Sequence, residues 1–166
     1  HSLLAQSRGA RAVFFDTAPE QFLVGGSKEG GAFVASTRDK VVARSVYTRG
    51  GMDFEKTERA LELAEIPRGQ ALMIDIGANI GWFSLHLARR VGPAGTVHAF
   101  EPEPFNHRLL LVNAQANGLS CIVPHAVALG AETGQALLHT TAHNGGAVDE
   151  RMWAYKNLSV PSSIMR

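Results

Sequence analysis

One short stretch constrains the fold of this chain more than any other: the apolar run Ala71–Ile76, followed directly by a turn that contains glycines. The run carries one acid, Asp75, near its end, and Gly77 and Gly81 mark the turn that follows. A continuous apolar run is typical of a parallel strand that is buried on both faces. A glycine turn that leads from such a strand into a helix predicts the carboxyl edge of a parallel sheet, shaped to hold a nucleoside.

From residue 71 onward the sequence alternates between apolar runs and helical spacing. Strands are predicted at 71–76, 96–100 and 121–123, and helices at 80–91 and 104–116, with a further extended segment at 135–140. The second of these helices is expected to bury a stripe made of Phe105, Leu109, Val112 and Ala116. This order of elements predicts an α/β fold with a parallel sheet.

The first part of the chain does not show the alternation of strands and helices. Residues 1–52 are interpreted as an N-terminal extension with short strands, and residues 53–166 as the nucleoside-binding domain. Short strands are predicted at 32–35 and 41–43, and a helix at 54–65 that Asp53 would cap.

Charge and composition exclude several classes of function. The 166 residues have a formal net charge of +1, which gives no electrostatic case for binding nucleic acid. No apolar run approaches the roughly 20 residues of a membrane span, so no membrane association is predicted. Cys121 is the single cysteine, which excludes an internal disulfide and favours a cytoplasmic protein.

Isolated histidines and aromatic residues give weaker signals. His139 and His143 stand four residues apart, but no metal-binding helix pattern surrounds them, so no metal site is predicted. Trp82 is expected to pack inside the protein rather than to stack on a substrate, and His125 follows the third predicted strand.

The residues after Gly77 indicate which nucleoside ligand fits the turn. A dinucleotide site needs a second and a third glycine, and this chain has Asn79 and Trp82 at those positions. Because the second glycine lets the backbone approach a pyrophosphate, Asn79 argues against NAD and is compatible with S-adenosylmethionine. No Gly-Lys-Ser/Thr sequence occurs, which excludes a P-loop. The amides at the start of the helix are expected to face the ligand.

Glu101 ends the second predicted strand and is followed by Pro102. A carboxylate at this place in a nucleoside-binding sheet can accept hydrogen bonds from both ribose hydroxyls of an adenosine. NAD and S-adenosylmethionine sites share this feature, so Glu101 alone does not choose between them.

The sequences Asp75–Gly81 and Ala99–Pro102, together with Asn113 and Asn117–Leu119, resemble the FkbM family of S-adenosylmethionine-dependent methyltransferases. The resemblance implies a Rossmann-like methyltransferase fold and methyl transfer to a hydroxyl of a small molecule, often a sugar or a related natural product. It also implies a cofactor site, in which the methionine moiety would be surrounded by Asp75, Gly77, Ala78, Asn79 and Gly81. Glu101 would hold the ribose, Pro102 would shape its edge, and Ala126 and Val127 would lie near the adenine.

The chain departs from this family in its later part. A methyltransferase of this fold continues through a fourth strand that ends in an acidic motif, and no such motif follows residue 120. The sheet is therefore expected to be truncated after its third strand, which would leave Ala71–Ile76 at an edge with unpaired backbone groups. We expect a missing C-terminal segment or another chain to complete the sheet.

Three functions remain open from the sequence. The first is an S-adenosylmethionine-dependent O-methyltransferase, in which the protein mainly aligns the acceptor oxygen with an already activated methyl group. The second is a nucleoside-binding domain or fragment without catalytic activity of its own. The third, a nucleotide-dependent oxidoreductase, is disfavoured by Asn79. No catalytic base is identified in the sequence.

Overall fold

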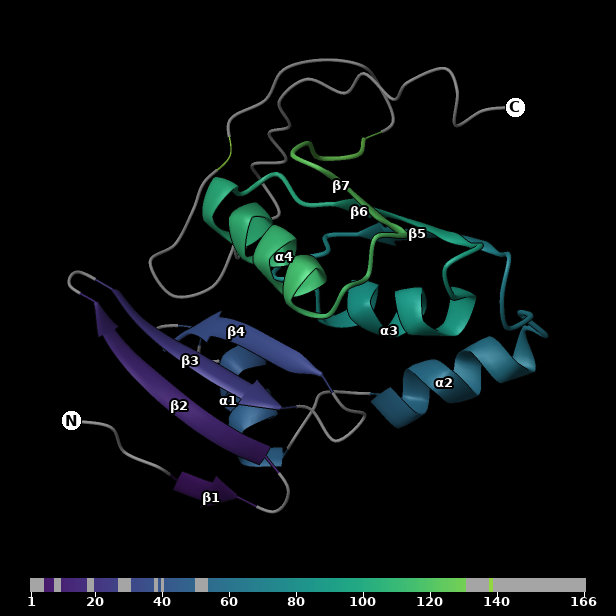
Figure 1. The fold of residues 1–166 in the computed structure, drawn as a ribbon. Helices are drawn as coiled ribbons and strands as arrows, with labels where there is room; N and C mark the ends of the chain where they lie inside the picture. The colour runs from purple at the N-terminus through teal and green to yellow at the C-terminus, as the bar shows by residue number, and fades with distance from the viewer. Residues whose placement is uncertain are drawn as a thin grey trace.

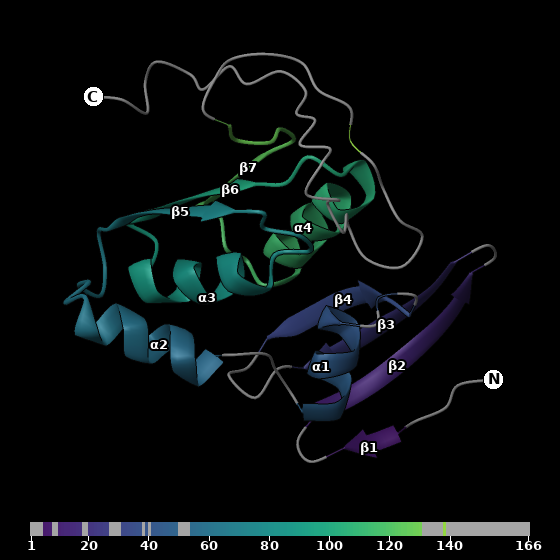
Figure 2. The same ribbon diagram turned by 180° about the vertical axis from the view of Figure 1, so that it is seen from behind.

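The computed structural model describes residues 5–7, 10–17, 20–26, 31–37, 39, 41–49, 54–130 and 138. They form an antiparallel sheet of four strands and a parallel sheet of three strands (Figure 1). Both views of the ribbon place helix α4 (Pro104–Ala116) between the two sheets (Figures 1 and 2). The helix contacts strands of each sheet and therefore joins them.

The antiparallel sheet has its strands in sequence order: β1 (Ala5–Ser7), β2 (Ala10–Thr17), β3 (Glu20–Gly26) and β4 (Ala32–Ser36). The strand predicted at 32–35 is therefore confirmed. The strand predicted at 41–43 is wrong, because these residues begin helix α1 (Val42–Arg49). The Asp39 carboxylate accepts hydrogen bonds from the amides of Val41 at 2.8 Å and Val42 at 2.9 Å, and this cap starts a helix where the apolar run suggested a strand.

The parallel sheet contains β5 (Leu72–Ile76), β6 (Thr96–Phe100) and β7 (Ile122–His125) in that order, which confirms the three predicted strands. Helix α2 (Phe54–Leu63) precedes the sheet, and α3 (Trp82–Val91) and α4 connect its strands. The α/β fold with a parallel sheet is thus confirmed. The predicted segment at 135–140 and the proposed cap Asp53 lie outside the described residues. Within the described part of the chain, no helix is long and apolar enough to cross a membrane.

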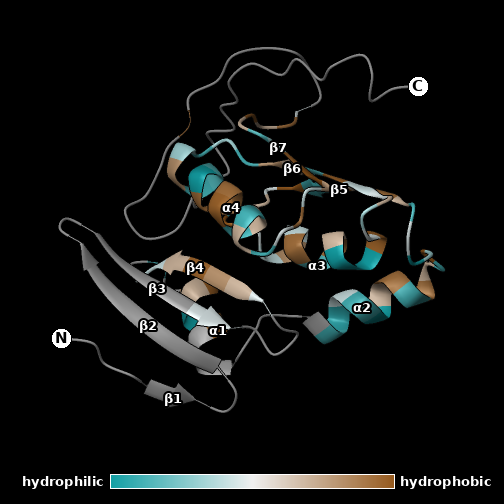
Figure 3. Cartoon of the chain, in the orientation of Figure 1, coloured by the Kyte–Doolittle hydropathy of each residue, from teal (hydrophilic) through white to brown (hydrophobic). Residues whose placement is uncertain are grey.

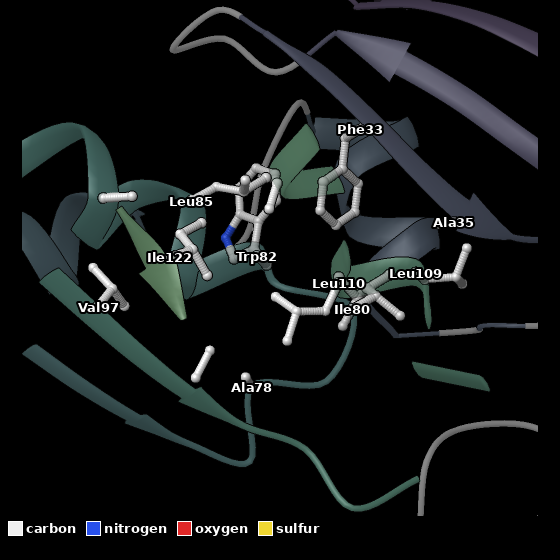
Figure 4. Close-up of a cluster of buried hydrophobic side chains, with 14 of the residues drawn as sticks. Phe33, Ala35, Ala78, Ile80, Trp82, Leu85, Val97, Leu109, Leu110 and Ile122 are labelled. Carbon is white, nitrogen blue, oxygen red and sulfur yellow. The ribbon is translucent and has the colours of Figure 1, made fainter. Parts of the chain in front are cut away.

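The core lies between the parallel sheet and the two helices that cover one of its faces. Val97 and Ala99 on β6 are completely buried beneath α3 and α4. Trp82 is 3% exposed and meets the ring of Phe33 on β4 edge to face, with the ring centroids 5.2 Å apart (Figure 4). The prediction that Trp82 packs inside the protein is confirmed, and this contact also fixes β4 against α3.

Helix α4 buries only part of the predicted stripe: Leu109 is buried and Phe105 packs against the core. Val112 and Ala116 are exposed, whereas the buried positions are Asn106, Leu109, Leu110, Asn113 and Ala114. The predicted stripe assumed that the helix packs on a single sheet, but α4 contacts β4 as well as β7. Hydrophilic and hydrophobic residues alternate along α2 and α4 (Figure 3). In α4 two asparagines, Asn106 and Asn113, lie inside the buried face.

Strand β5 is open on one face and at one edge. Leu72, Ile74 and Ile76 point to the same face and are 58%, 49% and 67% exposed. Among the described residues, β5 pairs with β6 and with no other strand. The expectation that this strand is buried on both faces is therefore wrong for the part of the chain that the structure describes, since α3 and α4 cover only one face (Figures 1 and 2).

Candidate functional site

The loop after β5, residues 77–81, forms a tight turn that we call the glycine turn. Gly77, Asn79 and Gly81 all have positive φ angles, of 77°, 52° and 91°. Glycine adopts such angles without steric penalty, and asparagine is among the few other residues that tolerate them. The alternation of these residues therefore sets the shape of the turn, and it explains why Asn79 can occupy a position where dinucleotide sites have glycine.

The backbone amides of the glycine turn are all engaged within the protein. Those of Gly77 and Ala78 donate to the Phe100 carbonyl at 3.0 Å, and that of Asn79 donates to the Glu101 carboxylate at 2.8 Å. The Ile80 amide donates to the Asn79 side chain and the Gly81 amide to the Ala78 carbonyl. The expectation that amides at the helix start face the ligand does not hold for those of Ile80 and Gly81. The amides of this turn offer no nest for a pyrophosphate.

Asp75 takes the place of a helix cap for α3. The residue at the cap position, Gly81, has no side chain to accept from the first turn. Instead the Asp75 carboxylate accepts from the Ser84 hydroxyl at 2.6 Å and also from the Ser84 backbone amide. Burial raises the pKa of Asp75 above its ordinary value, and the bonds from Ser84 oppose this rise. The strand acid therefore ties the end of β5 to the start of the next helix.

Glu101 joins the two loops at the carboxyl edge of the sheet. Its side chain is buried, and its two carboxylate oxygens accept from the amides of Asn79 and Glu103, each at 2.8 Å. Burial raises the pKa of Glu101, while the bonds from Glu103 and Asn79 act in the opposite direction. The Asn106 side chain is a further donor close to this carboxylate. Because a carboxylate has about four lone-pair sites, Glu101 still has capacity to accept from a ligand.

The third strand ends at the same edge. The Glu101 amide donates to the carbonyl of His125 at 3.0 Å, so Ala126 and Val127 follow directly beside Glu101 and Pro102. Ala126 is exposed and Val127 is half-buried. The fold thus brings the predicted site residues of all three strand ends to one edge of the sheet.

The two glycines of the turn have different surroundings. A Cβ atom added to Gly77 would meet nothing within 4 Å, whereas one added to Gly81 would lie 2.6 Å from Leu110 Cδ1 on α4. The close approach at Gly81 is therefore to α4. The described residues therefore leave open space beside Gly77, at the end of β5.

No site role was predicted for Asn113, which the structure brings to the glycine turn. Its Nδ2 donates to the carbonyl of Ile80 at 2.8 Å. The signal in the sequence is its spacing, since Asn113 lies four residues after Leu109 and one turn before Asn117 on the same helix. No group of three or more His, Cys, Asp or Glu side chains suited to a metal occurs in the described ranges. His139 and His143 lie outside them.

Comparison with known proteins gives a match to one family over just over half of the chain. The model described as "Methyltransferase FkbM domain" matches residues 75–162. This range begins at Asp75 and contains the glycine turn, Glu101 and both residues after β7. A fungal protein named "Methyltransferase 1", from Beauveria bassiana, is 31% identical over 75 residues. The match covers 45% of this chain and 29% of that protein, so the chain spans less than a third of the relative's length.

Solved structures give more distant matches. The structure of M. jannaschii TYW2 in complex with AdoMet is 20% identical with a TM-score of 0.45, covering 69% of this chain and 46% of that one. The fibrillarin of Aeropyrum pernix with natively bound S-adenosyl-L-methionine is 19% identical with a TM-score of 0.35, covering 75% of this chain and 55% of that one. Both TM-scores are below 0.5, so these matches add nothing to the family match.

Proposed function

Because the chain belongs to the FkbM family of methyltransferases, we propose that it binds S-adenosylmethionine at the carboxyl edge of β5 and β6. We further propose that the protein transfers the methyl group to a hydroxyl of a sugar or related natural product. The observation that carries the proposal is the position of Glu101, a buried carboxylate that is bonded to the glycine turn and has lone pairs left for a ribose. NAD is disfavoured because the turn has no free amides of its own.

Each part of the cofactor has a proposed set of neighbours in this site. Glu101 would accept from the ribose hydroxyls, and Pro102 would limit the ribose on one side. The adenine would lie near the residues that follow β7, Ala126 and Val127. The methionine moiety would lie along the end of β5 and the glycine turn, near Asp75, Gly77, Ala78, Asn79 and Gly81.

The chemistry requires little of the protein beyond placement. S-adenosylmethionine supplies a methyl group that is already activated on a sulfonium. The residues of this chain would hold the cofactor and orient it, so that an acceptor hydroxyl can approach in line with the methyl group. The glycine turn is suited to this task because every amide from Gly77 to Gly81 is fixed by a hydrogen bond. We assign no catalytic base among the described residues.

One observation favours a second function, a nucleoside-binding domain that does not catalyse methyl transfer by itself. The open face and edge of β5 lie directly before the site, where Ile76 is 67% exposed. A pocket for the methyl acceptor must be lined by protein residues. Among the described residues, none covers the exposed face of β5 next to the site. Binding and catalysis must therefore be tested separately.

Calorimetry tests the first part of the proposal. We expect S-adenosylmethionine and S-adenosylhomocysteine to bind this chain with dissociation constants between about 1 μM and 1 mM, the usual range for an enzyme's small ligands. NAD, added at the same concentrations, serves as the control and should give no heat of binding. Binding of NAD but not of S-adenosylmethionine would contradict the proposal. A methyl-transfer assay with a panel of sugar hydroxyl acceptors then separates a catalyst from a binding domain.

We also propose that a further strand, from another chain or from a further segment of the protein, pairs with the open edge of β5. The exposed aliphatic side chains of Leu72, Ile74 and Ile76 support this, because natural edge strands are rarely left both apolar and unpaired. Replacing Ile74 with lysine should leave this chain folded and reduce its self-association, measured by sedimentation. The matched change on the covered face, Val97→Lys, should unfold it. If folded Ile74→Lys self-associates as strongly as the unmodified chain, pairing of another chain at this edge is refuted.

Two broader proposals follow from the arrangement. Residues 1–52 are proposed to form an N-terminal extension, since β1–β4 and α1 all lie within them, and residues 53–166 are proposed to form the cofactor-binding domain. A cytoplasmic location is proposed because the single cysteine, Cys121, is a free thiol.

A further inference from the structure

We propose that Asn113 is a positioning residue, which holds the glycine turn in its cofactor-binding shape and couples that shape to the N-terminal sheet. The inference rests on the proposed function, because it assigns a role in cofactor binding. Asn113 lies in the middle of α4 and is completely buried, which is unusual for an asparagine. A buried amide in this position needs an explanation in terms of the groups it bonds.

The side chain of Asn113 uses its oxygen and its nitrogen on two separate elements. On β4, Oδ1 accepts from the Val34 amide at 2.7 Å and Nδ2 donates to the Val34 carbonyl at 2.9 Å. On the glycine turn, Nδ2 donates to the Ile80 carbonyl at 2.8 Å. Both hydrogens and the oxygen are therefore engaged, and their pattern fixes the orientation of the amide.

The Ile80 carbonyl needs such a donor. The backbone ladder of α3 starts with the bond from the Leu85 amide to the Gly81 carbonyl, so Ile80 lies just before it. The amide that would otherwise reach back, that of Ser84, is bonded to Asp75. Ile80 is also 2% exposed, so water does not reach the residue freely. A buried carbonyl without a partner is costly, and Asn113 supplies the missing donor.

Glu101 and Asn113 hold the two peptide units that flank the Asn79–Ile80 peptide bond. Glu101 accepts from the amide of Asn79, and Asn113 donates to the carbonyl of Ile80. Asn79 is the non-glycine residue of the turn with a positive φ angle, and so it is the residue whose conformation most needs support. Loss of Asn113 should therefore let the turn relax and draw the Asn79 amide away from Glu101, which we propose as the ribose ligand.

On its other side Asn113 extends the edge of β4. Val34 lies opposite Val24 on β3, and both its amide and its carbonyl are bonded to the Asn113 side chain, as a neighbouring strand would bond them. Asn117, one helical turn later, makes a similar bond from Nδ2 to the Ala32 carbonyl at 2.7 Å, and it accepts from Arg89 at 3.0 Å. Asn117 thus contributes to the docking of β4 but forms no bond to the glycine turn, which makes it a matched control.

The test compares Asn113→Ala with Asn117→Ala by two measurements: calorimetry with S-adenosylhomocysteine, and amide hydrogen exchange resolved by residue with NMR. We expect Asn113→Ala to weaken binding by about 10-fold or more, the effect of losing one buried hydrogen bond, and to speed exchange of the Asn79 and Ile80 amides. Asn117→Ala should leave binding and the exchange of these two amides within about twofold of the unmodified chain. If the two variants weaken binding equally, Asn113 acts only by docking β4 against α4, and the proposal is overturned.

The test still decides if Asn113→Ala does not fold or if the unmodified chain binds no ligand. If Asn113→Ala does not fold, Asn113→Ser replaces it, because serine brings no charge into the buried site and its shorter side chain does not reproduce the amide donor to Ile80. If the unmodified chain binds no S-adenosylhomocysteine, the proposed function fails, but the exchange of the Asn79 and Ile80 amides still decides whether Asn113 holds the turn. Unchanged exchange of these amides in a folded Asn113 variant would overturn the proposal in either case.

Discussion

Replacing Gly81 with alanine is expected to destabilise this chain by about 2–5 kcal/mol, a large share of the stability of a small domain. Two causes add. The φ angle of 91° is unfavourable for any residue with a side chain, which costs roughly 1–2 kcal/mol. The new methyl group would also lie 2.6 Å from Leu110 Cδ1, and overpacking of this kind costs typically about 1–3 kcal/mol. Urea denaturation followed by circular dichroism measures the change.

Gly77→Ala is the matched control for this prediction. Gly77 has a similar φ angle of 77°, but a Cβ atom there meets nothing within 4 Å, so only the backbone cost of about 1–2 kcal/mol applies. The steric part of the Gly81 effect should be relieved by Leu110→Ala, so the double variant should lose less stability than the sum of the single variants. Additive losses would show that Leu110 does not restrict Gly81.

Replacing Glu101 with alanine is expected to weaken binding of S-adenosylhomocysteine by about 10- to 100-fold, since hydrogen bonds to a charged group contribute roughly 1.5–3 kcal/mol each. The side chain has two possible contributions, through the ribose and through the Asn79 amide that it holds at 2.8 Å. Calorimetry of Glu101→Ala alone measures their sum. Unchanged affinity would refute the proposed role of Glu101 altogether.

A ligand without ribose hydroxyls separates the two contributions of Glu101. The unmodified chain should bind the 2′,3′-dideoxy form of S-adenosylhomocysteine more weakly than the natural compound. Glu101→Ala should bind both compounds with similar affinity, because the group that distinguishes them is gone. If the variant still discriminates between them as strongly as the unmodified chain, Glu101 acts only by holding the glycine turn.

The protonation of Glu101 predicts how binding depends on pH. Burial raises its pKa above the ordinary value of 4.5. Acidification should therefore weaken cofactor binding at a pH above that at which a free glutamate titrates, because the protonated acid is a poorer acceptor for two hydroxyls. The stability of the folded chain depends on pH in the opposite direction: Glu101 stabilises it more at low pH than at high pH. The folded chain holds this proton where the unfolded chain has lost it, so the contribution of Glu101 decreases as pH rises from 4.5 through the raised pKa.

The sequence was sufficient to predict the parallel sheet and the composition of its carboxyl edge. The apolar run before Gly77 and the alternation of strands with helices are local signals, and the three strands form as they predict. The strand predicted at 41–43 failed for a reason that is also local, the cap that Asp39 provides for α1. A turn residue before a short apolar run is compatible with either element, and here the Asp39 cap favours the helix.

Other features could not be predicted because they depend on contacts between distant parts of the chain. The buried face of α4 is set by β4, more than seventy residues earlier in the sequence, so a stripe based on apolar residues alone missed Asn113. The internal bonding of the glycine turn depends on the Phe100 carbonyl and on Glu101, which follow a helix later. The residue types at the site were predictable, but the hydrogen bonds among them were not.

The bonding of the amides from Gly77 to Gly81 has a consequence for recognition. A ligand that binds at this edge meets a turn whose amides are already hydrogen-bonded, so binding does not have to order the loop. Such preorganisation lowers the entropic cost of association. It also limits what the turn can recognise, since its own amides have no donors left to offer. Selectivity at this edge must then come from the shape of the turn and from acceptors such as Glu101, which favours ligands that carry donors, as the ribose of an adenosine does.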